Sequence, residues 1–289
     1  MICAEPASHV QKSINRASVA AARARTARAL LAECRFCAHD CGVNRLMGET
    51  GPCHAGAKAH FFSAQTEVSD EIELIPTFAV ALSGCDMRCD FCITGASSWN
   101  PRAGLSFSPK EMAAKARAAL RNGARTIMVL GGEPTIHLPA ALEFVSHLPD
   151  TAKLIWKTNA HGSAQSRELL DGMFDVWLAD FKFGNDTCAL RLAKTLDYVG
   201  IVQENLLWAH SHSELIVRHL LMPGHVECCW RPVAEWLAEN LPGVKVNLRT
   251  GFWPAWHATR HRELCDTLTV PYGQQAVELA QQFRLNLIS

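Results

Sequence analysis

Three cysteines in the first half of the chain have the type and spacing of ligands for an iron–sulfur cluster. Cys85, Cys89 and Cys92 form a C-x3-C-x2-C pattern directly after an apolar stretch. Three thiolates are one ligand too few for a closed tetrahedral zinc site. They suit a 4Fe-4S cluster in which three irons take cysteine and the fourth stays open for another ligand. The next cysteine, Cys188, lies far along the chain, so the triplet predicts a cluster with an open coordination position.

A second group supplies the four thiolates of a closed site. Its members lie within twenty residues of one another and are Cys34, Cys37, Cys41 and Cys53. Zinc and iron–sulfur clusters both accept four thiolates, and the spacing does not choose between them. The short, loop-rich segment slightly favours zinc or another structural metal, which would fold a module with little core of its own. An auxiliary iron–sulfur cluster is the alternative, and nearby His39 is expected to be a solvated loop histidine.

The remaining cysteines show no ligand spacing. Cys228 and Cys229 are expected to be a buried pair of thiols, Cys188 and Cys265 core residues, and Cys3 part of a disordered terminus. Tight grouping of seven of the twelve cysteines favours metal ligation in a reducing compartment over disulfides. Residues 1–30 contain no apolar run ahead of a cleavage site, so no secretory leader is expected and a cytoplasmic location is predicted.

Composition excludes several classes of function. The 289 residues are 48% hydrophobic, and 28 basic residues balance 28 acidic ones. Nucleic-acid and membrane-surface binding need an excess of one sign, so neither partner is expected. No segment has the roughly 18 apolar residues that span a bilayer. The basic, alanine-rich stretch at residues 10–32 is predicted to be a helix leading into the first cysteine group; a mitochondrial transit peptide is the alternative.

Alternating strand and helix patterns from residue 77 onward predict the fold. Predicted strands cover residues 77–83, 126–130, 153–157, 176–181, 214–221 and 245–248. Predicted helices cover residues 108–121, 138–147, 163–173, 187–208, 230–240 and 272–284. Six β-then-α units imply a parallel sheet with right-handed crossovers, either an open doubly wound sheet or a partial barrel. Both place chemistry at the carboxyl ends of the strands.

We expect an α/β fold, a partial (β/α)6 TIM-like barrel with a short N-terminal cysteine-rich module. The expected divisions are an N-terminal helix (1–33), a cysteine-rich metal-binding module (34–62) and the core domain (77–285). The cysteine triplet and the polar residues after later strands would then meet at one edge of the sheet.

The cysteine loop resembles the defining motif of the radical S-adenosylmethionine superfamily, with Phe91 directly before its third cysteine. Gly131-Gly132-Glu133-Pro134, at the end of the second predicted strand, resembles that superfamily's GGEP motif. The resemblance implies that the backbone there and Glu133 receive the amino group of the methionine moiety.

Further segments resemble the activating-enzyme branch, the pyruvate formate-lyase activating enzymes and their relatives. These are Thr158-Asn159, Asp180-Phe181-Lys182, Arg218-His219 and residues 222–224. An uncharacterised group of iron–sulfur proteins related to those enzymes shares the CRxCxxxCGVNRxxGExGxC pattern at residues 34–53 and the VRHLxxPG string at 217–224. The resemblance covers about residues 30–285.

The expected cofactor-binding residues follow from these motifs and from the strand-end rule. They are Gly131, Gly132, Glu133, Pro134, Lys157, Asn159, Asp180, Lys182 and Arg218. Asp180 and Lys182 are predicted to contact the ribose or the carboxylate, with a surface ion pair as the alternative. Arg218 and His219 alternate across their strand, and motif position favours Arg218 on the interior side.

Two positions depart from the activating-enzyme pattern. Lys157 stands where those enzymes have an acidic residue of a monovalent cation site, so its ammonium is predicted to replace the cation. Ile93-Thr94 follows Cys92 where many relatives have Gln-Asn, which puts an asparagine contact to the cofactor in doubt.

The resemblance implies reductive cleavage of S-adenosylmethionine to a 5′-deoxyadenosyl radical that abstracts hydrogen from a substrate. An electron donor such as flavodoxin or ferredoxin is then expected. Two kinds of substrate remain possible. One is a partner protein on which a glycyl radical is installed; the other is a peptide, protein side chain or small metabolite that is modified directly. A non-enzymatic metal-binding interaction protein is the alternative from a different class.

Overall fold

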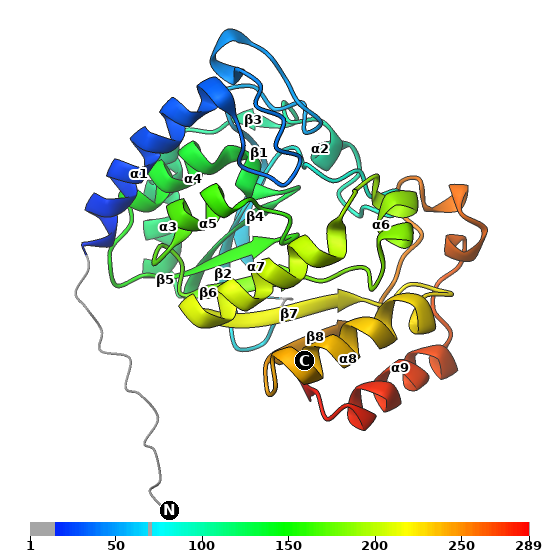
Figure 1. The fold of residues 1–289 in the computed structure, drawn as a ribbon. Coiled ribbons are helices and arrows are strands. Elements are labelled where there is room, and N and C mark those ends of the chain that lie inside the picture. The colour runs from blue at the N-terminus through cyan, green and yellow to red at the C-terminus, as the bar shows by residue number, and fades with distance from the viewer. Residues whose placement is uncertain (1–14, 69–70, 289) are drawn as a thin grey trace, which may run out of the picture.

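A mostly parallel sheet, wrapped by helices, forms the frame of the molecule in the computed structural model, which describes residues 15–68 and 71–288 (Figure 1). The strands are β1 (His60–Glu67), β2 (Thr77–Leu82), β3 (Leu105–Ser106), β4 (Thr126–Gly131), β5 (Lys153–Thr158), β6 (Val176–Asp180), β7 (Glu214–Leu220), β8 (Lys245–Arg249) and β9 (Asn286–Leu287). The helices are α1 (Arg16–Leu30), α2 (Ala96–Trp99), α3 (Pro109–Arg121), α4 (Leu138–Ser146), α5 (Ala164–Leu170), α6 (Asp186–Ala193), α7 (Tyr198–His212), α8 (Arg231–Asn240) and α9 (Val270–Gln282).

The strand order is β3-β1-β2-β4-β5-β6-β7-β8-β9, and every pairing from β2 to β9 is parallel. Sequential parallel strands joined by helices form an open run of βα units, so the predicted partial (β/α)6 barrel is confirmed. The six predicted strands are β2 and β4 to β8, with bounds that differ by at most one residue at either end. Their carboxyl ends share one edge of the sheet.

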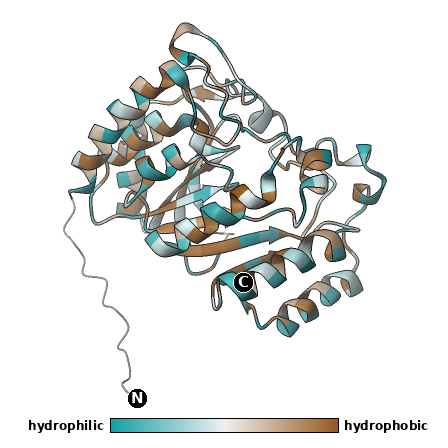
Figure 2. Ribbon diagram, in the orientation of Figure 1, coloured by the Kyte–Doolittle hydropathy of each residue, from teal (hydrophilic) through white to brown (hydrophobic). Residues whose placement is uncertain are grey.

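The two faces of the sheet carry separate apolar clusters. On the helix-covered face, a register row runs through Val80, Val129, Trp156 and Trp177, and all four belong to the main core. A smaller cluster on the other face includes Met128, Ile155, Leu178 and Ile216, each fully buried. Figure 2 shows this hydrophobic colouring along the central strands, with polar residues on the outer sides of the helices. Burial on both faces explains the near-continuous apolar runs of these strands.

The structure differs from the predicted elements at one helix and at the sheet edge. The helix predicted at residues 187–208 is wrong as a single element, because Lys194 (φ 57°) and Asp197 (φ 49°) adopt left-handed conformations and separate α6 from α7. The edge strands were not predicted: β1 pairs antiparallel with β2, β3 pairs with β1, and β9 pairs with β8 at the other edge. Both misses concern connections whose conformation depends on neighbouring elements rather than on local apolar periodicity.

Helix α1 packs against α4 and belongs to the folded body (Figure 1). Small side chains at Ala20, Ala24 and Ala27 are buried in this contact. Arg16 is also buried: its Nη1 lies 3.0 Å from Asp175 Oδ2, and its Nη2 donates to the carbonyl of Asp150 at 2.9 Å. Most of the predicted 10–32 helix is therefore a packed element; residues 10–14 and Cys3 lie outside the described residues.

Among the helices of the described residues, none is long and apolar enough to cross a membrane.

Candidate functional site

A cavity of about 320 Å³ opens at the carboxyl ends of the parallel strands. Cys85, Cys89 and Cys92 all line it, from the loop that follows β2. The other predicted cofactor-binding residues in its lining are Gly131, Gly132, Lys157, Asn159, Asp180, Lys182 and Arg218. The structure therefore brings together residues that are up to 133 positions apart, from Cys85 to Arg218. The exceptions are Glu133 and Pro134, which are not among the lining residues.

The polar side of the cavity results from the two-residue period of the strands. Lys157, Asp180 and Arg218 each lie two positions after a fully buried apolar residue of the inner face. Side chains two apart point to the same side of a strand, so the inner face is apolar at its floor and charged where it reaches the cavity. On the opposite face of β7, His219 is buried against Trp230, and its Nδ1–H donates to the carbonyl oxygen of Phe181 at 2.7 Å.

A chain of opposite charges crosses this inner face. Lys182 Nζ is ion-paired with Asp180 Oδ2, and Arg218 Nη1 lies 4.0 Å from Asp180 Oδ1. Arg218 Nε lies 3.0 Å from Glu71 Oε1, a fully buried carboxylate ahead of β2. Burial opposes ionisation of Asp180, but the charges of Lys182 and Arg218 outweigh it and lower the pKa of that carboxyl. The group thus stays ionised at neutral pH.

Glu133 lies behind the cavity wall and joins the ends of β4 and β5. Its carboxylate accepts from the backbone N–H of Thr135 at 3.0 Å, from Thr158 Oγ1 at 2.9 Å and from the backbone N–H of Asn159 at 2.7 Å. It is 1% exposed, and burial, with a contribution from nearby Asp86, raises its pKa to about 7. These contacts join Glu133 to the ends of β4 and β5, and Gly131 and Gly132 are the residues of this motif that line the cavity. Pro134 begins the buried turn at 134–137.

Asp86 fixes the first part of the cysteine loop. Its Oδ1 accepts from Asn159 Nδ2 at 2.7 Å, and its Oδ2 lies 2.8 Å from His161 Nδ1. Burial opposes ionisation of Asp86, but the hydrogen bonds and the charge of His161, with the hydrogen bond from Asn159, lower the pKa of this carboxyl. His39 Nε2 lies 3.0 Å from the Asp86 carbonyl oxygen, so the predicted solvated loop histidine instead contacts the cysteine loop.

Asp90 fixes the second part of the loop. Its Oδ2 accepts from Lys194 Nζ at 3.0 Å and lies 2.7 Å from His261 Nε2. The backbone N–H of Asp90 donates to the carbonyl of Leu192 at 2.8 Å, and that of Arg88 donates to the carbonyl of Ala193 at 2.9 Å. The carboxyl end of α6 therefore holds the loop in place.

Two glycines allow β4 to end directly against the cysteine loop. A Cβ on Gly132 would lie 2.0 Å from the carbonyl oxygen of Gly84 and 3.2 Å from Cys85 Cβ. Gly131 adopts φ 147°, and a Cβ there would lie 2.0 Å from the Leu82 carbonyl oxygen. Glycine is therefore needed at positions 131 and 132 because a side chain would collide with neighbouring backbone, whatever the site binds.

Of the three loop thiols, those of Cys85 and Cys89 are buried and that of Cys92 is half-buried. Burial, with the nearby charge of Asp86, raises the pKa of Cys85 well above its ordinary value, and burial raises that of Cys89 to about 12. The backbone N–H of Met87 donates to Cys85 Sγ at 3.4 Å. In the described part of the chain, two groups of three or more ligand residues have their ligand atoms within 4.8 Å of one another, and these three cysteines form neither. The three thiols line the cavity without converging within 4.8 Å of one another.

The second cysteine group lies beside this loop. Cys34 accepts from Arg45 Nη1 at 3.5 Å, while Arg45 also donates to the carbonyl of Ile136 at 2.7 Å. Burial, with the charges of Asp86 and of neighbouring cysteines, raises the pKa of Cys37. Cys41 Sγ would lie 2.5 Å from a Cβ on Gly51. The four sulfurs of this group do not all lie within 4.8 Å of one another, and no three of them form such a set in residues 15–68 and 71–288.

Several functional residues were missed by sequence reasoning. Asp86 and Asp90 each follow a cysteine of the triplet, which is the signal that could have identified them. His161 lies two residues after the Thr-Asn motif, whereas Glu71 had no local signal. The expectation that Cys265 is a core residue is wrong: it is exposed, and its Sγ contacts the carbonyls of Thr259 and His261.

Comparisons with known proteins agree with this geometry. The family model described as the Radical SAM superfamily matches residues 80–237. An uncharacterized protein of Methanocaldococcus jannaschii, MJ0674, is 32% identical over 273 residues, which cover 91% of this chain and 78% of that protein. Among solved structures, Streptococcus suis SuiB bound to the precursor peptide SuiA matches with a TM-score of 0.53 and 15% identity. The match covers 70% of this chain and 46% of SuiB, so the chain spans less than half of SuiB's length.

Replacing Gly132 by alanine tests the contact between β4 and the cysteine loop. We expect Gly132→Ala to lower the free energy of unfolding by about 1–3 kcal/mol, as overpacking does, because backbone must move to admit the Cβ. Gly200→Ala on α7 is the matched control. Its Cβ meets no atom within 4 Å, and it should stabilise by up to about 1 kcal/mol. The free energies of unfolding of both variants are measured by urea denaturation. If Gly132→Ala is as stable as Gly200→Ala, the steric role of Gly132 is contradicted.

Proposed function

Because the chain belongs to the radical SAM superfamily, we propose that its Cys85, Cys89 and Cys92 hold a 4Fe-4S cluster at which S-adenosylmethionine is cleaved. The observation that carries this proposal is the shared cavity: the three cysteines and the charged strand-end residues line one space. Membership of the superfamily implies an enzyme, so a purely metal-binding interaction protein is set aside.

The donor set fits a cluster. Three thiols that line a cavity without converging within 4.8 Å would suit three cysteine ligands on three irons of a cluster, and the fourth iron would be left for another ligand. Because burial raises the pKa of Cys85 and Cys89, these thiols keep their protons until a cation is bound. Loading the site should therefore release protons.

The strand-end residues fit the polar parts of S-adenosylmethionine. Carbonyls of Gly131 and Gly132 suit its ammonium, and the ammonium of Lys157 suits its carboxylate. Asp180, which stays ionised, can accept hydrogen bonds from ribose hydroxyls. Asn159, Lys182 and Arg218 complete the polar wall.

When bound, the reduced cluster supplies the electron that cleaves the sulfonium C–S bond and yields a 5′-deoxyadenosyl radical for hydrogen abstraction. The chain's own contribution is to bind, orient and exclude water. Asp86 and Asp90 hold the loop, Glu133 aligns the ends of β4 and β5, and buried apolar residues close the floor of the barrel. Flavodoxin or ferredoxin is the class of electron donor we propose.

We propose a peptide or protein segment as the substrate. Ile93 and Trp253 line the cavity yet are 79% and 65% exposed, so they form an apolar rim at its mouth. We infer that these two side chains contact an apolar part of the substrate. The solved complex of SuiB with a precursor peptide accords with such a substrate on a related fold. Installation of a glycyl radical, as in the activating enzymes whose motifs the chain resembles, is one form of this chemistry; direct modification of a side chain is the other.

For the second cysteine group we propose an auxiliary iron–sulfur cluster rather than zinc. Zinc bound by four thiolates would bring the sulfurs to about 3.8 Å from one another, from a Zn–S distance of about 2.3 Å. The sulfurs of Cys34, Cys37, Cys41 and Cys53 do not form such a compact set. A cluster spreads its four ligands over four irons, which agrees with the wider arrangement.

The loop cysteines are tested by product formation. After anaerobic reconstitution and reduction, the protein should convert S-adenosylmethionine to 5′-deoxyadenosine, measured by chromatography. Cys85→Ala should lose this activity at least 100-fold because it removes a cluster ligand, whereas exposed Cys265→Ala should retain it. Absence of 5′-deoxyadenosine from a fully reconstituted, reduced sample would contradict the proposal.

Lys157 is tested through the affinity for S-adenosylmethionine. We expect Lys157→Ala to weaken binding about tenfold, equivalent to about 1.4 kcal/mol, because a carboxylate loses its counter-ion. Lys153→Ala, on the same strand and paired with Glu214 at 3.4 Å, is the control and should bind normally. Wild-type turnover should not depend on Na⁺ or K⁺; a dependence on these ions counts against the role of Lys157.

The second group is tested by metal content. The double variant Cys34→Ser/Cys37→Ser should lose about half of the iron and sulfide of the reconstituted protein, as expected for one of two clusters of equal size. Zinc should stay unchanged. Loss of one zinc per chain with full retention of iron would show that this group is a zinc site.

A further inference from the structure

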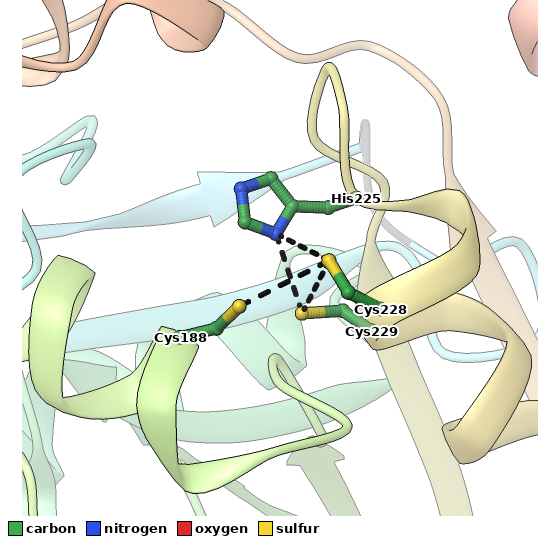
Figure 3. A group of neighbouring side chains, drawn as sticks. All are labelled: Cys188, His225, Cys228 and Cys229. Atoms are coloured by element: carbon green, nitrogen blue, oxygen red, sulfur yellow. Dashed lines mark hydrogen bonds between the residues drawn. The ribbon is translucent and has the colours of Figure 1, made fainter.

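A third group of potential metal ligands lies outside the cavity, between α6 and the segment that precedes α8. Cys188 comes from α6, and His225, Cys228 and Cys229 come from residues 225–230, which follow β7 (Figure 3). All four side chains point toward one another, and their ligand atoms lie within 4.8 Å of one another. Cys188, His225 and Cys229 are buried, and Cys228 is half-buried. None of these residues lines the proposed cofactor cavity.

The distances fit a single tetrahedral ion. Cys228 Sγ lies 3.9 Å from both Cys188 Sγ and Cys229 Sγ, and His225 Nδ1 lies 3.3 Å from the sulfurs of Cys228 and Cys229. A zinc ion with Zn–S of about 2.3 Å and Zn–N of about 2.0 Å places its ligand atoms about 3.5–3.8 Å apart. We propose that these three cysteines and His225 bind one structural zinc ion.

The local backbone makes the convergence possible. Residues 226–230 form a wide π-type turn in which the N–H groups of Cys229 and Trp230 both donate to the His225 carbonyl, at 3.1 and 3.0 Å. This turn places His225, Cys228 and Cys229 on one side. Opposite it, Gly184 lets the start of α6 approach, since a Cβ there would lie 2.4 Å from the Cys229 carbonyl oxygen. Such π-type turns are rare overall, and those that do occur are often found at functional sites.

The surroundings supply what a Cys3His zinc site needs. Metal binding through Nδ1 leaves the imidazole proton of His225 on Nε2, and Glu263 Oε1 lies 3.8 Å from that nitrogen. A carboxylate behind a ligand histidine orients the ring and raises its basicity. Three thiolates and Zn²⁺ carry a net charge of −1, and the guanidinium of Arg191, ion-paired with Glu263, lies beside them. Arg191 Nη2 lies 3.4 Å from His225 Nε2 and would turn away from that nitrogen once it carries the proton.

Other states of these residues explain less of the arrangement. A disulfide between Cys188 and Cys228 would use two of the four groups and leave His225 and Cys229 without a purpose in the cluster. A cubane cluster spreads its ligands over separate irons and would hold them farther apart than this compact set. Three thiols packed only as small apolar residues would not require an imidazole nitrogen at 3.3 Å from two sulfurs.

The ion would support the cysteine loop through α6. The start of α6 would be fixed to residues 225–229 by the metal, and its end holds the backbone of Arg88 and Asp90 through the carbonyls of Ala193 and Leu192. Zinc here is thus a positioning element: it ties the β7–α8 connection to the loop that carries Cys89. This role stands whether or not the proposed function is correct.

Zinc content of variants of the full-length chain tests the proposal. Protein is produced anaerobically with zinc, and metal per chain is measured by mass spectrometry. Cys188→Ser/Cys228→Ser should contain one zinc less than wild type, whereas Cys265→Ser, a change of an exposed cysteine outside the group, should match wild type. Because the readout is a difference between variants, metal held by the other two cysteine groups cancels. Equal zinc in the double variant and the control overturns the proposal.

Two further measurements keep the outcome interpretable. Co²⁺ in place of zinc should give tetrahedral thiolate bands that the double variant loses, with far-UV circular dichroism to confirm folding. Glu263→Gln, a partly exposed change that spares all four ligands, should lose zinc to a chelator at a concentration about tenfold lower than wild type does. If the anaerobic protein carries a Cys188–Cys228 disulfide, or if chelator resistance is the same in Glu263→Gln, the site is not built as proposed.

Discussion

The arrangement of the site depends on one buried carboxylate, that of Asp86. It is 2% exposed and lies between the cysteine loop and the ends of the strands. One oxygen accepts from Asn159 and the other pairs with His161, both directly after β5. The carbonyl of the same residue contacts His39 from the N-terminal cysteine segment. Leaving one partner of a buried hydrogen bond unsatisfied costs about 1–3 kcal/mol, so the contacts of Asp86 constrain the loop, the strand end and the cysteine segment together.

The parallel sheet supplies the second constraint. Its inner face is apolar at Ile155, Leu178 and Ile216 and becomes charged two residues later on each strand. A fixed two-residue period means that the apolar floor also determines which strand-end side chains face the cavity. Arg218 faces the interior together with Glu71, while His219 packs outward against Trp230. Core packing and site geometry are thus two consequences of the same register.

Cysteine is used in two distinct geometries in this chain. Cys188, Cys228 and Cys229 converge with a histidine within 4.8 Å, whereas the loop triplet and the 34–53 group do not form such compact sets within the described residues. The contrast lies in the distances and not in the residue types. Helix α6 connects the two kinds of site, because its start carries Cys188 and its end holds the loop backbone at Asp90.

The sequence by itself determined six of the strands, β2 and β4 to β8, and their parallel pairing, and it singled out the loop cysteines as candidate ligands. Apolar runs buried on both faces and a short cysteine motif are local signals, and they specify local structure and ligand type. Only the tertiary structure decided the partners of Asp86 and Asp90, the position of Glu133 behind the cavity wall, and the break between α6 and α7. It also brought Cys188 together with His225, Cys228 and Cys229, which lie 37 or more positions away in the chain. The sequence had predicted these cysteines only as buried thiols. The physical reason is that burial and charge pairing act between residues distant in the chain, where local periodicity carries no information.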